Sequence, residues 1–128
     1  MIRNLNPITF QAYGTILPEK PDSTKLSALG NHHDTLRLSQ GLLPVYHTCS
    51  DTWLYSRSGM TVLAIREAGN FVHFYLDKPV CLRQNISFCL IPLVQETSAE
   101  MAYNLSPAVI EQCAWTESLQ VRHHLRVE

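Results

Sequence analysis

The chain has 128 residues, a length that fits one domain able to bury its own hydrophobic core. Hydrophobic residues make up 45% and charged residues 16% of it, which excludes an intrinsically disordered chain. The formal net charge of −1 gives no reason to expect nucleic acid or an anionic membrane as a partner. The N-terminal residues lack the apolar core of a signal peptide, and no apolar run approaches the roughly 20 residues that span a bilayer. We therefore expect a cytoplasmic protein.

The N-terminal residues 1–17 predict a short helix followed by a strand. Asn6 is a favourable N-cap and Pro7 suits the first helical position. Gly14 suits a left-handed stop after the helix. We expect the strand to begin directly after this glycine and to end at Pro18.

Residues 18–35 are rich in polar residues and proline and predict a long loop, in which His32 and His33 are either solvated or part of a lid. Residues 36–128 show β-strand patterns separated by turn-rich segments about ten residues apart, and EAGN at 67–70 could close a hairpin. We predict one mainly β domain, an antiparallel sandwich or barrel in which two sheets enclose a semi-polar interior. The expected strands are Leu42–Thr48, Thr52–Arg57, Met60–Arg66, Phe71–Leu76, Ile86–Val94, Ala99–Asn104 and Leu119–Val127.

Several of these strands carry polar and aromatic side chains at alternate positions, which places them on one face of each strand. If these faces line one cavity, it would have aromatic walls and convergent polar groups, as small-molecule sites do. The residues are His73, Tyr75 and Asp77 on one strand, Trp53, Tyr55 and Arg57 on a second, and His47 on a third.

Each residue type suits a role in such a site. Arg57 could hold a carboxylate through two parallel hydrogen bonds. A histidine could exchange a proton near neutral pH, and tyrosine could donate a hydrogen bond to a substrate oxygen. The hypothesis makes His73 and Tyr75 catalytic and assigns substrate binding to Trp53, Tyr55, Arg57, His47 and Asp77.

Two other interpretations remain open for the same residues. Aromatic and charged cross-strand pairs are also typical of the outer face of an antiparallel sheet. Two or more of His47, His73 and His123 could instead bind a metal ion.

Two stretches resemble known families. LNPITFQAYGTILPE, residues 5–19, resembles the N-terminal signature of the ureidoglycolate lyase family, where a short helix ends in an aromatic-glycine pair before a strand. GNFVHFYLDKPVCLRQNISFCLIPL, residues 69–93, resembles the second half of a cupin barrel. The resemblance implies a cupin-like jelly-roll barrel that acts on or binds a small polar acid, such as ureidoglycolate, or a sugar derivative.

The chain departs from metal-dependent cupins at the metal ligands. Those proteins present a His-x-His pair, which this sequence lacks. Where they commonly place a proline-glycine step and then a histidine, this chain has Gln84 and Asn85 and then Phe88. We therefore predict no metal and no other cofactor, and a turn that Asn85 forms in the left-handed conformation.

The four cysteines, Cys49, Cys81, Cys89 and Cys113, form no C-x-x-C pair, and we expect them to be reduced and buried. Whether the protein is an enzyme stays open among three hypotheses. It is a metal-independent lyase or isomerase, a ligand-binding domain that has lost catalysis, or a structural β-domain. In each case we expect a homodimer, because apolar-rich sheet edges favour pairing with a second copy.

Overall fold

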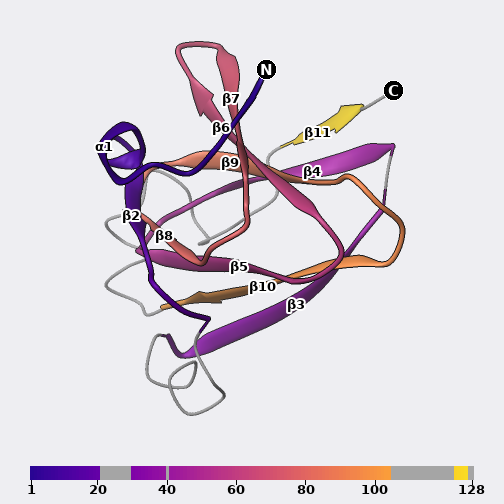
Figure 1. The fold of residues 1–128 in the computed structure, drawn as a ribbon, viewed down its shortest axis with the longest axis horizontal. Helices are drawn as coiled ribbons and strands as arrows, with labels where there is room; N and C mark the ends of the chain where they lie inside the picture. The colour runs from indigo at the N-terminus through magenta and orange to yellow at the C-terminus, as the bar shows by residue number, and fades with distance from the viewer. Residues whose placement is uncertain (21–29, 40, 105–122, 127–128) are drawn as a thin grey trace.

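The structure is a computed structural model that describes residues 1–20, 30–39, 41–104 and 123–126. In these residues eleven strands form two sheets that pack face to face (Figure 1). All described strand pairs are antiparallel except the parallel pair of β1 and β7. The six-stranded sheet has the order β1 (Ile2–Arg3), β7 (Asn70–Tyr75), β6 (Thr61–Glu67), β9 (Ser87–Pro92), β4 (Leu42–His47) and β11 (His123–Arg126). The five-stranded sheet has the order β2 (Gly14–Ile16), β8 (Val80–Leu82), β5 (Thr52–Ser58), β10 (Thr97–Tyr103) and β3 (His32–Leu38).

The mainly β, two-sheet architecture confirms the coarse prediction. A closed barrel is not formed, because no described strand of one sheet pairs with a strand of the other. Each sheet therefore keeps two edges, at β1 and β11 in one and at β2 and β3 in the other. The strand expected at 119–127 is described only over His123–Arg126, as β11.

The N-terminal helix α1, Pro7–Phe10, begins as predicted. The Asn6 side chain accepts hydrogen bonds from the backbone amides of Ile8, at 2.8 Å, and of Thr9, at 3.4 Å. The predicted left-handed stop at Gly14 is wrong, since this residue opens β2. A glycine is needed there for space, because a Cβ atom would lie 1.9 Å from the backbone oxygen of Cys81 on the paired strand.

The predicted loop 18–35 ends earlier than expected. Residues His32 to Leu38 form β3, which pairs with β10 from Tyr103 opposite His32 to Thr97 opposite Leu38. His32 and His33 are therefore exposed strand residues rather than loop or lid residues. The paired residues lie 59 to 71 positions apart in the sequence, so the polar local composition is overridden by a tertiary contact.

Two predicted turns are confirmed. β6 and β7 form a hairpin whose turn residues, Ala68 and Gly69, have φ of 51° and 86°. Asn85 has φ of 69°, the left-handed conformation expected for it.

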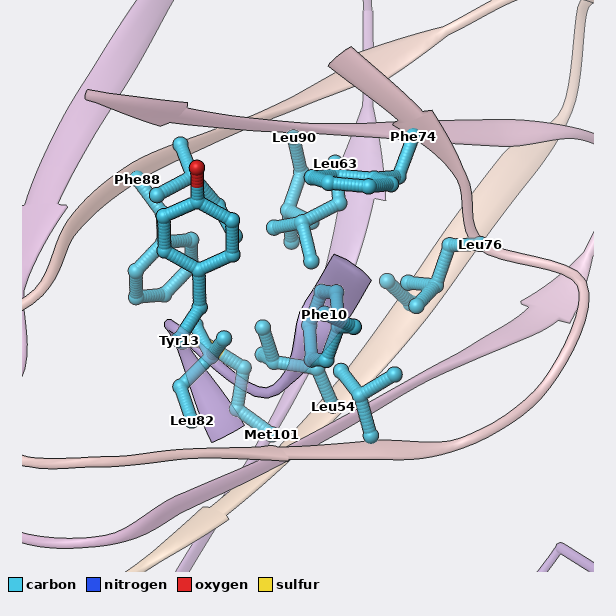
Figure 2. Close-up of a cluster of buried hydrophobic side chains, with 13 residues drawn as sticks. Phe10, Tyr13, Leu54, Leu63, Phe74, Leu76, Leu82, Phe88, Leu90 and Met101 are labelled. Carbon is cyan, nitrogen blue, oxygen red and sulfur yellow. The ribbon is translucent and has the colours of Figure 1, made fainter. Parts of the chain in front are cut away.

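The space between the two sheets is filled by apolar side chains (Figure 2). Phe74 contacts the rings of Phe10 and Tyr13 edge to face, with centroid distances of 5.2 and 5.9 Å. Figure 2 shows these rings converging from α1, from the segment after it and from β7. A second, smaller apolar cluster occupies the opposite face of the six-stranded sheet and contains Leu43, Val45, Ala64 and Cys89.

Candidate functional site

The candidate residues of β5 and β7 lie on the strand faces that point away from the core. Leu54 and Phe74 belong to the core between the sheets. Because side chains alternate along a strand, Tyr55 and Arg57 on β5 and Tyr75 on β7 face the other way. The expected semi-polar interior is therefore wrong, since the inner faces hold the more apolar residues of each strand.

Four of the seven candidate residues nevertheless line one cavity, with a volume of about 440 Å³. It lies where the turn between β5 and β6 meets the segment that follows β7. A hydrogen bond of 2.9 Å from the Leu76 amide to the Thr61 carbonyl joins these two parts of the chain. The lining residues described are Asn4, Lys20, Tyr55, Ser56, Arg57, Ser58, Gly59, Met60, Thr61, Tyr75, Leu76, Asp77 and Lys78.

The charges on this lining are unequal. Arg57, Lys20 and Lys78 are cationic, and Asp77 is the one carboxylate among the described lining residues. The whole chain carries a formal net charge of −1, so the cavity is more positive than the protein around it. A concave surface with this excess of cations attracts anions.

Glu100 on β10 holds Arg57 in place. The Arg57 Nη1 atom donates to the Glu100 Oε1 atom at 3.0 Å, and the Thr35 hydroxyl donates to the same oxygen at 2.8 Å. The side chain of Arg57 is 61% exposed, while that of Glu100 is only 11% exposed. The carboxylate is thus the buried anchor, and most of the arginine side chain remains accessible.

Tyr55 adds a hydrogen-bond donor to the cavity. Burial raises the pKa of its phenol, and the negative charge of Glu100 raises it further, while Arg57 lowers it. The phenol is therefore protonated at neutral pH and can donate to a ligand oxygen.

The other three candidates lie elsewhere. His73 is opposite Ala64 in the β6–β7 pair, and burial, followed by the charge of the N-terminal amine, lowers its pKa. His47 is near the end of β4, where its Nδ1 atom is 3.1 Å from the Ser87 hydroxyl. Trp53 is opposite Cys81 in the β5–β8 pair. The described cavity lining contains none of the three, so the structure does not bring the histidines to Arg57 and the tyrosines.

Sequence reasoning missed three residues that shape the site. Lys20 and Lys78 reach the cavity only through the tertiary fold, and nothing local distinguishes them. Glu100 had a usable signal, because it is a charged residue in the strand SAEMAY between two apolar neighbours. A carboxylate in such a position usually has a cationic partner.

The described residues that could bind a metal are dispersed. Among the described residues no three of His, Cys, Asp or Glu are grouped so that they could hold an ion. Phe88, at the position where the cupin resemblance expects a ligand, is fully buried and stacks on Tyr46 with a centroid distance of 5.4 Å. The side chain of His123 lies outside the described residues.

The cysteines differ from the expectation in one respect. Cys81 and Cys89 are free, and burial raises the pKa of each thiol to about 11. Cys49 is disulfide-bonded, so the prediction of four reduced cysteines is wrong. The spacing of cysteines in a sequence does not show which of them meet in the fold. Because disulfides are rare in cytosolic proteins, this bond weighs against the expected cytoplasmic location.

No family model, curated protein or solved structure matches the chain. No helix in the described residues has the length and apolar character needed to cross a membrane. The cavity and its charges are the features of the molecule that point to a function.

Proposed function

We propose that the protein is a cupin-like jelly-roll domain that binds a small carboxylic acid, without a metal ion, in the cavity lined by Tyr55, Arg57, Tyr75 and Asp77. The observation that carries the proposal is the lining itself, which has three cationic side chains, one carboxylate and two tyrosines in one concave site. An arginine fork and phenol hydroxyls are the groups that fix a carboxylate by charge-assisted hydrogen bonds.

Two features support the cupin-like part of the proposal. The described strands form two antiparallel-rich sheets around one apolar core, the arrangement from which jelly rolls are built. Asn85 takes the left-handed conformation at the turn where cupins commonly have glycine. Phe88 then fills core space at a position where a metal ligand would be expected.

Binding is better supported by these groups than lyase or isomerase chemistry. Acid–base catalysis near neutral pH is most often performed by histidine, and His73 and His47 are not among the described lining residues. The phenol of Tyr55 has a raised pKa and so serves as a donor rather than as a base. The lining therefore favours the alternative of a ligand-binding domain over a metal-independent enzyme.

Isothermal titration calorimetry with acetate, lactate and butyrate tests the proposal. We expect Arg57→Gln to weaken carboxylate binding by roughly tenfold, the effect of losing one charge-assisted hydrogen bond worth about 1.5 kcal/mol. Lys78→Gln should weaken binding less and should reduce its dependence on salt. The matched control is Arg66→Gln, which removes an exposed arginine outside the described cavity lining and should leave binding unchanged.

The folded state should survive the Arg57 substitution, because the Glu100 carboxylate keeps its hydrogen bond from Thr35 and the glutamine amide can still donate to it. Equal binding by the wild-type protein, Arg57→Gln and Arg66→Gln would remove the cavity as the carboxylate site. So would equally tight binding of the corresponding primary amines.

A further inference from the structure

Three exposed apolar side chains lie together beside the cavity. Met60, Leu93 and Val94 are large and exposed, and the Leu93 amide donates to the Met60 carbonyl at 2.9 Å. The other exposed large apolar residues described are Met1 and Ile8, in the N-terminal segment. We call Met60, Leu93 and Val94 the apolar ledge.

Thr97 and Gly59 fix the shape of the ledge. The Thr97 hydroxyl donates to the Val94 carbonyl at 2.7 Å and accepts from the Met60 amide at 3.3 Å. Gly59 has φ of +73°, and a Cβ atom on it would lie 2.2 Å from the Thr97 hydroxyl. The two turns that carry the ledge are therefore bound to each other through one buried side chain.

The ledge continues into the cavity. Met60 lines the cavity, and so do Tyr55, Tyr75 and Leu76. Arg57 supplies positive charge to the same space. A ligand bound there would contact a cationic group and an exposed apolar surface at the same time.

We infer that the ligand is an amphipathic monocarboxylate, with its carboxylate on Arg57 and an alkyl or aryl group of several carbons against the ledge. This inference rests on the proposed function, because it concerns the same cavity. A polyhydroxylated acid such as a sugar acid fits less well, since its hydroxyl groups would lose water against Met60, Leu93 and Val94 without gaining hydrogen-bond partners. An apolar group would instead remove these three exposed side chains from water.

The test is calorimetry with acetate, butyrate, hexanoate, octanoate and gluconate, below the concentrations at which the longer acids form micelles. Complete burial of a methylene strengthens binding about fourfold, so partial burial on the ledge predicts a two- to fourfold gain per methylene. Gluconate should bind no more tightly than acetate. Met60→Ser should flatten the dependence on chain length while acetate binding is kept. Ile8→Ser, which removes an exposed apolar side chain outside the described lining, is the control.

The outcomes separate this inference from the proposed function. Carboxylates that all bind with the same affinity, whatever their length, would overturn the ledge inference and leave the proposed function standing. Absence of binding by every acid in the series would overturn both. Octan-1-ol binding as tightly as octanoate would show that the carboxylate is not recognised and would also overturn the inference. If Met60→Ser converted a dimer to a monomer in sedimentation experiments without changing the chain-length dependence, the ledge would be assigned to a second copy of the chain instead.

Discussion

Replacing Thr97 with valine should lower the free energy of unfolding by about 2 kcal/mol. Thr97 is 2% exposed, and its hydroxyl joins the Val94 carbonyl at 2.7 Å to the Met60 amide at 3.3 Å. Valine has nearly the same shape but can neither donate nor accept, so two hydrogen bonds of about 1 kcal/mol each are lost. For a domain of this size the change corresponds to a fall in Tm of roughly 6–10 °C.

Two other buried threonines provide matched controls. The Thr48 hydroxyl donates to the Arg83 carbonyl at 2.7 Å and accepts from the Ile86 amide at 2.9 Å, so it also makes two bonds. The Thr52 hydroxyl donates one bond, of 3.0 Å, to the Ser50 carbonyl. We therefore expect Thr48→Val to cost about 2 kcal/mol and Thr52→Val about half as much.

Urea unfolding followed by tryptophan fluorescence measures all three variants, provided that the m values remain equal. Because only Thr97 borders the apolar ledge, only Thr97→Val should also weaken the chain-length dependence of carboxylate binding. The reasoning is refuted if Thr52→Val destabilises the protein as much as Thr97→Val, or if Thr97→Val costs less than about 0.5 kcal/mol.

Three further predictions concern stability and thiol chemistry. Burial and the hydrogen bond to Asp34 raise the pKa of Tyr103 from 10.0 to about 12, so the folded state retains a proton that the unfolded chain releases. The free energy of unfolding, measured in urea, should therefore fall as the pH rises from 10 to 12, and Tyr103→Phe should remove part of this fall. The thiol pKa of Cys81 and of Cys89 is about 11 rather than 9.0, so at pH 8 iodoacetamide should alkylate each about 100-fold more slowly than an unperturbed thiol. Mass spectrometry measures this rate, which should recover when the protein is unfolded in urea. Gly14→Ala should destabilise the fold by about 3 kcal/mol or more in the same unfolding assay, because the backbone oxygen 1.9 Å from the new Cβ cannot rotate away as a flexible side chain could.

The predictions from sequence that are confirmed depend on short-range chemistry. Asn6 caps α1 through its own side chain, and the turn between β6 and β7 contains Gly69, which tolerates positive φ. Asn85 is a further example. In each case the information lies within a few residues, so a single sequence is sufficient.

The misassigned elements depend on partners that are distant in the sequence. β3 is a strand because β10 pairs with all seven of its residues, and the three-residue strand β8 forms between β2 and β5. Neither has a strong hydrophobic alternation of its own. The predicted loop 18–35 reflects a polar composition that tertiary pairing overrides in β3, and β8 is not among the expected strands.

The candidate site was predicted only in part, because its assembly also depends on tertiary packing. Alternation correctly grouped Tyr55 with Arg57, and Tyr75 with Asp77, but a period of two residues does not show which face of a strand is buried. That choice depends on which face is more apolar, and the alternate positions containing Leu54 and Phe74 fill the core. A comparison of the two faces of each strand would have placed the polar groups outside the sheet interior.

The exposed fractions of the two side chains indicate that a ligand can reach Arg57 more readily than Glu100. The Arg57 side chain is 61% exposed and that of Glu100 is 11% exposed, so the arginine is at the surface while the carboxylate is largely buried. Arg57 and the Thr35 hydroxyl both donate to the Glu100 carboxylate, so the arginine helps to compensate a buried charge. The contact with Glu100 uses the Nη1 atom, and the planar guanidinium has further N–H donors that point in other directions. Arg57 can thus bind a second carboxylate while Glu100 keeps its orientation fixed, which a lysine, as a single flexible point charge, could not do as well.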